Sequence, residues 1–328
     1  TMSKTMLLCS GQGSQYEGMG KQLLALCPEA ETIYQCGSDI TGMDLKQLCL
    51  EADAATLAQT KISQPAIFTT SLVAIKAMEK AGFTFDGAAG HSLGEYPAMV
   101  AAGMVSMEDG FRLIKERAAC MQECAQQQSG SMCAILGLTP QQVEEGCAQV
   151  EGYVVPVNYN SPVQTVVAGE TAAVDAAIAK FTEMGARRCV KLAVSAAFHS
   201  KLMQPAADAF YEKIKDVKFS MPQKEFYCNL TGQLLTDVSD MPGYLAKHIV
   251  SPVRSTTELD NMQQAGYDTF VECGPGKVLT GLVKKTLSGV NAINVEDEKT
   301  YQKALEVLGL CHKPIPKSPA SGCWATLW

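Results

Sequence analysis

The sequence predicts an α/β fold, in which a large α/β-hydrolase-like domain is interrupted by a small ferredoxin-like subdomain. Three observations predict it. The 328 residues are 47% apolar, enough for a large core. A G-x-S-x-G pattern at residues 90–94 follows a short strand-like segment and precedes a helical one, which is typical of an α/β-hydrolase-like core. Further along the chain, residues 130–197 show the order β-α-β-β-α-β of a ferredoxin-like unit.

The large domain is therefore expected to be discontinuous, with residues 1–129 and 198–310 on either side of the subdomain at 130–197. Its first strand is predicted at residues 6–9, followed by a glycine-containing turn at 11–15. Helices are expected within 29–58 and over 64–82, and a weak strand over 82–90. Ser106 and Asp109 have the capping-box spacing that begins a helix.

The subdomain is predicted from alternating strand-like and helical segments. Strands are expected at 132–138, 153–158, 164–169 and 188–194, with a turn at 160–162. Helices are expected from the Thr139-Pro140 start to about 150, and over 171–184, where Gly185 ends the second one. The large domain then resumes with a strand at 269–272, a turn at 274–276 and a helix from 278.

The last segment, residues 311–328, changes character and is treated as a proline-rich tail. Pro314, Pro316 and Pro319 favour extended chain over helix. A docking segment, a poorly ordered tail and an expression artefact remain as alternatives. At the other end, Thr1 before Met2 is expected to be a cloning remnant, and the following residues lack a secretory-signal profile.

Charge and cysteine content exclude several function classes. The net charge of -7 and the pI near 5.3 do not favour nucleic-acid binding. No apolar run approaches the ~20 residues that cross a bilayer, so no membrane association is expected. The thirteen scattered cysteines form no CxxC pair. Buried free thiols in a cytoplasmic protein are the interpretation we favour, with no metal site.

The G-x-S-x-G pattern makes Ser92 a candidate nucleophile, because small flanking residues let a serine stand clear of a sharp strand-to-helix turn. A serine hydroxyl needs a base, normally histidine. Four histidines are present. His91 adjoins the serine and is expected to be a packed or solvated turn residue, and His312 lies in the tail. His199, just past the last subdomain strand, is modestly favoured over His248.

Helix geometry predicts different exposure for two arginines, Arg117 and Arg112. On the helix that follows Ser106, Arg117 lies roughly 80° from the centre of the apolar stripe and Arg112 roughly 140° away. We therefore expect Arg117 at the edge of the buried face and Arg112 in solvent. A guanidinium presents paired donors that suit a carboxylate.

Four motifs together resemble one family, the malonyl-CoA:acyl-carrier-protein transacylases and the acyltransferase domains of fatty-acid and polyketide synthases. They are GQGSQ at 11–15, GHSLGEY at 90–96, AFHS at 197–200 and GPGKVL at 274–279, and the similarity spans about residues 5–310. The resemblance implies malonyl transfer from coenzyme A to an acyl carrier protein by a ping-pong reaction without a cofactor. Ser92 would be the nucleophile and His199 the base.

The resemblance also implies roles for further residues. The backbone amides of Gln12 and Leu93 would form the oxyanion hole, and Arg117 would hold the malonyl carboxylate. Asn160 falls on a family active-site position. Phe198 resembles the aromatic residue of malonyl-selective members and would narrow the space for an α-branch.

His248 departs from the family, which often has glutamine there. In the family this position steadies the catalytic histidine through its main-chain carbonyl, which any side chain leaves in place. We place His248 among the substrate-binding residues, with Arg117, Asn160 and Phe198, and expect a tolerated substitution that adds a titrating group near the site.

The carrier proteins of this family are acidic, so docking requires local positive charge. Two groups are candidates: Arg187, Arg188 and Lys191, and Lys277, Lys284 and Lys285. The protein is expected to act as a monomer. Three alternatives remain: a trans-acting polyketide-synthase acyltransferase, a hydrolase of acyl thioesters, and an inactive carrier-binding subunit.

Overall fold

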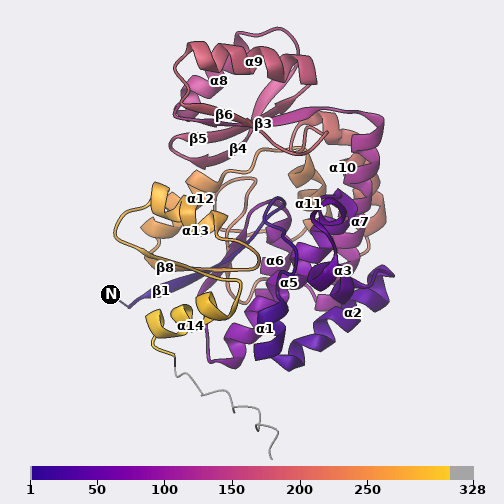
Figure 1. Cartoon of the computed structure of the whole chain (residues 1–328), viewed down its shortest axis with the longest axis vertical. Coiled ribbons are helices and arrows are strands. Elements are labelled where there is room, and N and C mark those ends of the chain that lie inside the picture. Colours follow the sequence, from indigo (N-terminus) through magenta and orange to yellow (C-terminus); the bar gives the residue numbers. More distant parts are fainter. Residues whose placement is uncertain (1, 311–328) are drawn as a thin grey trace, which may run out of the picture.

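A computed structural model describes residues 2–310, and the larger part of the molecule is built on a five-stranded parallel sheet (Figure 1). The strand order is β7-β2-β1-β8-β9. The strands are β1 (Lys4–Cys9), β2 (Gly87–Gly90), β7 (Glu225–Phe226), β8 (Tyr267–Cys273) and β9 (Asn291–Val295). The predicted α/β fold class is confirmed.

Strand β1 lies at the centre of this sheet and is apolar on both faces. Leu7 and Cys9 pack into the main core, whereas Met6 and Leu8 pack into a second cluster on the opposite face. Parallel strands covered on both faces read as continuous apolar runs, which is why the short segment Met6–Cys9 was recognisable as a strand.

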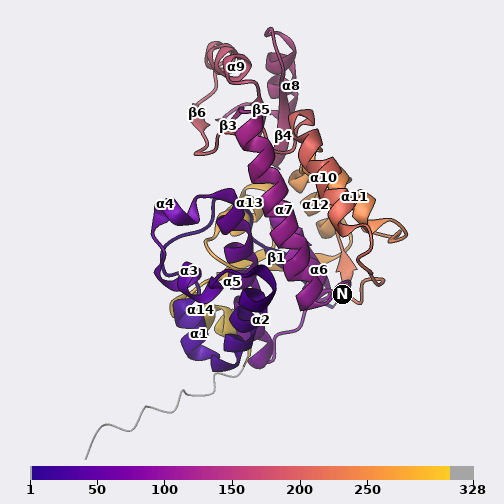
Figure 2. The ribbon, with the colours of Figure 1, turned by 90° about the vertical axis from the view of Figure 1, so that its right-hand side faces the viewer.

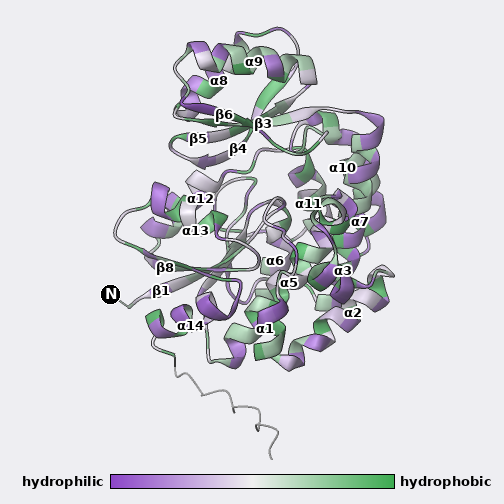
Figure 3. Ribbon diagram, in the orientation of Figure 1, coloured by the Kyte–Doolittle hydropathy of each residue, from purple (hydrophilic) through white to green (hydrophobic). Residues whose placement is uncertain are grey.

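Helices cover both faces of the sheet. They are α1 (Lys21–Leu26), α2 (Glu31–Thr41), α3 (Leu45–Glu51), α4 (Ala54–Leu57), α5 (Thr60–Lys80), α6 (Glu95–Ala101), α7 (Met107–Gln127), α10 (Gln204–Ile214), α11 (Met241–Ile249), α12 (Ser255–Gln264), α13 (Val278–Thr286) and α14 (Glu298–Val307). Figure 3 shows hydrophilic and hydrophobic residues mixed along α2 and α7, as expected for helices with one face in the core. Helix α5 is instead buried along most of its length.

The long helix α7 connects the two parts of the molecule (Figure 2). It begins as predicted, because Ser106 Oγ accepts a hydrogen bond from Asp109 N at 3.1 Å. The Asp109 carboxylate does not complete the capping box. It pairs instead with Arg112 Nη1 at 2.7 Å, and this pair holds Arg112 in solvent.

The smaller part is an antiparallel sheet with two helices on one face (Figure 1). The strand order is β4-β5-β3-β6. Its elements are β3 (Ser131–Leu136), α8 (Pro140–Ala148), β4 (Val154–Ser161), β5 (Gln164–Gly169), α9 (Thr171–Glu183) and β6 (Arg188–Lys191). The predicted β-α-β-β-α-β order is therefore confirmed. The exact domain boundaries at 129/130 and 197/198 stay a prediction.

Two local expectations were wrong. The turn expected at 160–162 is partly strand, because β4 continues through Asn160 and Ser161 and ends where Pro162 has no N–H to donate. Strand β6 ends at Lys191 and not at 194: its ladder with β3 covers Arg188–Lys191 and is followed by a last bond, from Leu192 N to the Met132 carbonyl.

The proline-rich tail at 311–328, with His312, lies outside the described residues. Among residues 2–310, no helix combines the length and the apolar character needed to cross a membrane. Those cysteines that the structure describes are free thiols, and most of them are buried.

Candidate active site

Ser92 stands on a sharp turn between β2 and α6. It begins a 3₁₀ turn at Ser92–Gly94 and has a φ of 56°, in the left-handed region. Added side chains would not fit around it: a Cβ on Gly90 would overlap the backbone of Gly94, and a Cβ on Gly94 would overlap the carbonyl of Cys9. The two glycines of the pattern are therefore required by close backbone approach.

His199 lies in the loop that returns from β6 to the larger part. Its Nε2 is 2.7 Å from Ser92 Oγ, although the two residues are 107 positions apart. Its φ is 65°, and within residues 2–310 Ser92 and His199 are the non-glycine residues with positive φ. Backbone strain of this kind concentrates at functional sites.

The tautomer of His199 follows from its partners. Nδ1 lies 2.9 Å from the His248 carbonyl and 3.0 Å from the Ser251 carbonyl. Carbonyls only accept, so Nδ1 carries the proton and Nε2 is free to accept from the serine hydroxyl. Burial, assisted by the nearby positive Arg117, lowers the pKa of His199 to about 3. The imidazole is therefore neutral at pH 7, as a base must be.

Arg117 reaches Ser92 from α7. The side chain is 1% exposed, so it is buried more completely than an edge position implied. Nη1 donates to Gln64 Oε1 at 2.8 Å, and Nη2 donates to Ser92 Oγ at 3.2 Å. Its Nε finds no hydrogen-bond partner in the described part of the chain. Burial lowers the pKa of Arg117, which nevertheless keeps its charge because its ordinary pKa is so high.

A cavity of about 410 Å³ opens beside the serine and lies between the two parts of the molecule. Gln12, Phe198 and His199 are on its wall, and Gln12 Nε2 donates to Thr60 Oγ1 at 3.2 Å. The remaining wall residues come from both parts: Gly13, Gln15, Ala58, His91, Ser92, Met121, Met132, Asn158, Lys191, Leu192, Ala193 and Val194. A site between two units of a fold is a common place for a ligand.

Asn160 and Leu93 lie behind this wall. Asn160 is buried, and its Oδ1 accepts from His91 Nε2 at 2.8 Å. It therefore fixes His91, which borders the cavity and which the sequence had suggested only as a turn residue. Leu93 is fully buried in the 3₁₀ turn, and its amide directly follows the serine.

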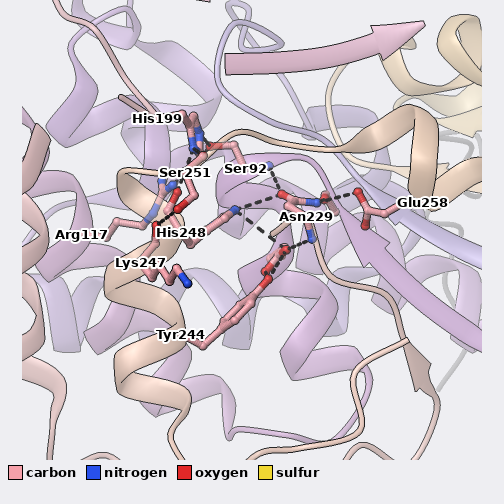
Figure 4. A network of polar contacts seen from close by, with 11 residues as sticks. Ser92, Arg117, His199, Asn229, Tyr244, Lys247, His248, Ser251 and Glu258 are labelled. Atoms are coloured by element: carbon pink, nitrogen blue, oxygen red, sulfur yellow. Dashed lines mark hydrogen bonds and ion pairs between the residues drawn. The ribbon is translucent and has the colours of Figure 1, made fainter. Parts of the chain in front are cut away.

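A buried polar network beneath Ser92 was missed from the sequence (Figure 4). At its centre, Asn229 Oδ1 accepts from Ser92 N at 2.8 Å and from His248 Nε2 at 3.0 Å. Asn229 Nδ2 donates to the Gly90 carbonyl at 2.6 Å and to Glu258 Oε2 at 3.0 Å. A signal for Asn229 existed, since a polar residue that follows a strand-like run lies at the functional edge of a parallel sheet.

Glu95 completes this network from the start of α6. It accepts from Asn229 N at 2.7 Å and from Tyr244 Oη at 2.9 Å. Burial raises the pKa of Glu95 to about 8 and that of Glu258 well above its ordinary value. Glu95 is therefore mostly protonated at neutral pH and adds little negative charge beneath the serine.

His248 is placed behind His199 and not on the cavity wall. Its side chain is fully buried, and burial lowers its pKa well below the ordinary value. His248 Nε2 and Glu95 Oε1 are 3.9 Å apart, but both groups are mainly uncharged at neutral pH and do not form an ion pair.

The candidate docking residues are exposed. Lys191 lines the cavity, and its Nζ pairs with Asp175 Oδ1 at 2.5 Å. Arg188 begins β6, and Arg187 directly precedes it. Lys284 and Lys285 are in the last turn of α13, which Lys277 precedes. Within residues 2–310, no group of three or more His, Cys, Asp or Glu side chains is arranged to hold a metal ion.

Comparison with known sequences supports one family. The acyl transferase domain family matches residues 6–315. A malonyl CoA-acyl carrier protein transacylase of Bacillus subtilis is 36% identical over 310 residues, 94% of this chain and 98% of the relative. The protein of the same name from Escherichia coli K12 is 35% identical over 309 residues, 93% and 100% of the two chains.

Comparison with solved structures points to the same family as the sequence comparison. A malonyl CoA-acyl carrier protein transacylase from Clostridium perfringens superimposes with a TM-score of 0.89 at 36% identity, covering 94% of this chain and 98% of the other. A malonyl-transacylase solved in complex with its acyl-carrier protein, of a type II polyketide synthase, gives a TM-score of 0.89 at 34% identity, over 93% and 100%.

Proposed function

Because this chain belongs to the acyl transferase family and is an acyltransferase, we propose that it carries malonyl from coenzyme A to the phosphopantetheine thiol of an acyl carrier protein. The intermediate is a malonyl ester on Ser92, so the reaction is ping-pong. Relatives named as malonyl transacylases support this reaction, and the arrangement around Ser92 supports the mechanism.

The observation that carries the choice of malonyl is the environment of Arg117. Its guanidinium touches Ser92 Oγ, and no carboxylate of residues 2–310 lies within 4 Å of it. A buried cation is stable only when it is paired and hydrogen-bonded. The free carboxylate of a malonyl group, held two carbons from the reacting carbonyl, supplies the missing partner and accepts from the unpaired Nε.

In the first half-reaction Ser92 Oγ attacks the thioester carbonyl of malonyl-CoA. His199 Nε2 takes the hydroxyl proton while the Oγ–C bond forms. When the tetrahedral intermediate collapses, the C–S bond breaks and Nε2 returns that proton to the coenzyme A thiolate. The two carbonyls on Nδ1 stabilise the transient imidazolium, the part an aspartate plays in a Ser-His-Asp triad.

The backbone amides of Gln12 and Leu93 are proposed to hold the oxyanion of that intermediate. Leu93 N follows the nucleophile in the 3₁₀ turn that leads into α6, where a helix dipole favours negative charge, and Gln12 lines the same cavity from the loop after β1. Phe198 on the cavity wall supports the preference for an unbranched malonyl group. Asn160, through His91, supports the wall beside the serine.

In the second half-reaction a phosphopantetheine thiol enters the same cavity. His199 Nε2 takes the thiol proton, the C–S bond to the carrier forms, and the Oγ–C bond breaks with the proton returning to Ser92. The exposed cations at the cavity and on α13 are proposed to meet the acidic carrier protein. We place this work in the cytoplasm, in keeping with the free thiols, and expect a monomer.

Intact-protein mass spectrometry after mixing with malonyl-CoA tests the proposal. We expect a malonyl adduct on the wild type that is absent from Ser92→Ala and is discharged by holo-carrier protein. Free malonate in place of transfer would show a hydrolase, and an unmodified protein with intact malonyl-CoA would show a different acyl donor or an inactive subunit.

A further inference from the structure

We propose that Asn229 and the imidazole of His248 form a positioning bridge that holds the Ser92 turn and the His199 loop in fixed relation. The inference rests on the proposed acyl transfer through Ser92 and His199. It assigns a role to Asn229, and it moves His248 from the substrate-binding residues to the residues that orient the reacting pair.

The orientation of the Asn229 amide is fixed by its partners. The atom near the Gly90 carbonyl and Glu258 must donate, and the atom near Ser92 N must accept. One side chain therefore binds the peptide groups on both sides of His91, in the turn that holds Ser92 at a φ of 56°. Without such bonds a non-glycine residue at this φ would relax.

The orientation of the Asn229 amide in turn decides which ring nitrogen of His248 donates a hydrogen bond. Because Asn229 Oδ1 only accepts, His248 Nε2 must donate to it, over 3.0 Å. Burial lowers the pKa of His248 well below its ordinary value and keeps the imidazole neutral, and its Nδ1 has no hydrogen-bond partner in the described residues. The same residue accepts from His199 Nδ1 through its main-chain oxygen at 2.9 Å.

His248 thus contacts the nucleophile turn with its side chain and the base with its backbone (Figure 4). It is fully buried and is not among the residues that line the cavity, so it has no surface to offer a substrate. The His199 and His248 rings lie edge to face with centroids 5.4 Å apart, which adds packing to the same link. A shift of α11 would move base and nucleophile relative to one another.

Three proteins test the bridge: the wild type, His248→Leu and His248→Gln. Leucine fills similar space but cannot donate, whereas the glutamine amide can donate to Asn229 Oδ1. Two rates are measured for each. One is single-turnover malonylation of Ser92 at saturating malonyl-CoA, and the other is phosphonylation of Ser92 by a small fluorophosphonate, which needs the Ser-His pair but no malonyl contact.

We expect His248→Leu to slow both rates by about tenfold, since a lost buried hydrogen bond of about 1.4 kcal/mol corresponds to that factor. His248→Gln is expected to restore both to near the wild-type values. Rates are taken per active site from the phosphonylation end point, so that lost stability does not count as lost reactivity. If His248→Leu does not fold, His248→Met takes its place as the variant without a donor.

Three outcomes would overturn the bridge. Wild-type rates in the leucine or methionine variant would show that the hydrogen bond is not needed. A fall in malonylation alone would make His248 a substrate contact. A glutamine variant as slow as the leucine one would mean that packing of the His248 ring, and not its hydrogen bond to Asn229, supports the two rates. Failure of the proposed function looks different: the wild type would be phosphonylated at Ser92 but not malonylated, and phosphonylation would still report on the bridge.

Discussion

At the residue scale, the site combines a charged guanidinium with a neighbouring carboxyl group that stays uncharged. Arg117 is buried with its guanidinium at the nucleophile, whereas Glu95, beneath the serine, stays mostly protonated at neutral pH. An ionised carboxylate beside Arg117 would compete with an acidic substrate. Because the Glu95 carboxyl is neutral, the Arg117 guanidinium stays available to bind the carboxylate of a substrate.

Arg117→Ala should reduce malonyl transfer by about 100-fold, because removing one partner of a buried charged pair costs about 3 kcal/mol or more. Acetyl transfer should fall far less, since acetyl has no carboxylate. Initial rates with malonyl-CoA and acetyl-CoA check this. Arg112→Ala, on the same helix but in solvent, is the matched control and should leave both rates unchanged. Equal losses for both acyl groups in Arg117→Ala would make the residue structural.

Glu95 gives a pH dependence with a definite sign. Its pKa is raised from 4.5 to about 8 in the folded chain, so between these values the folded state holds a proton that the unfolded state has lost. The stability contributed by this group is complete below pH 4.5 and is lost as the pH rises to 8.

Glu95→Gln, which imitates the protonated acid, should flatten that dependence. The free energy of unfolding of the wild type should fall more steeply between pH 5 and pH 8, by up to about 1.4 kcal/mol per pH unit relative to the variant. Denaturant titrations at several pH values measure it. Parallel curves for the two proteins would mean that Glu95 is ionised in the folded state.

At the element scale, the turn from β2 to α6 depends on glycine for space. A Cβ at Gly90 would overlap the backbone of Gly94, whereas a Cβ at Gly281, inside α13, would meet no atom within 4 Å. Gly90→Ala should therefore abolish or severely destabilise the fold. Gly281→Ala should raise the free energy of unfolding by about 0.5–1 kcal/mol, because alanine loses less backbone entropy in a helix. Denaturation curves of the two variants measure their free energies of unfolding. A stable Gly90→Ala protein would contradict the packing argument.

The elements that carry a local pattern could be predicted from sequence. Strand β1 is a short apolar run, α7 has its serine cap, and the Ser92 turn has its glycines. Arg117 and Arg112 were separated correctly by helical periodicity, yet Arg117 is buried more deeply than its stripe implied. Gln64 on α5 and Ser92 after β2 enclose it, and such contacts between distant segments leave no trace in a helical wheel.

Asn229 itself follows a strand-like run, but the partners that surround it could not be predicted, for the same reason. Glu95, Glu258 and Tyr244 read as ordinary polar residues of amphipathic helices, and only the packing of α6, α11 and α12 around the serine turn brings them together. His199 was found by elimination among the histidines and by family resemblance. Its paired carbonyls from His248 and Ser251 belong to the backbone, so no side-chain pattern encodes them.

At the scale of the whole molecule, the exposed candidate docking cations form two sets, one at β6, where Lys191 also lines the cavity, and one at α13. Lys284→Glu with Lys285→Glu should slow transfer to the carrier protein and weaken its salt dependence, whereas malonylation of Ser92 from coenzyme A should persist. Steady-state kinetics over a range of carrier concentrations and salt check this. Lys299→Glu with Lys303→Glu, on α14 away from the smaller part (Figure 1), is a control of equal charge change. Equal effects of the two pairs would indicate net charge alone.

The order of strands in the large sheet bears on how the chain is made. β1 is synthesised first and lies in the centre, yet its neighbour β8 begins at Tyr267. At ribosomal speeds of about 5–20 residues per second, one edge of β1 waits roughly 10–50 s for that partner. An unpaired apolar strand edge is a template for aggregation, so the growing chain carries this risk until β8 has emerged. Premature termination before β8 would therefore release a polypeptide with an open central edge, suited to capture by a chaperone or a protease.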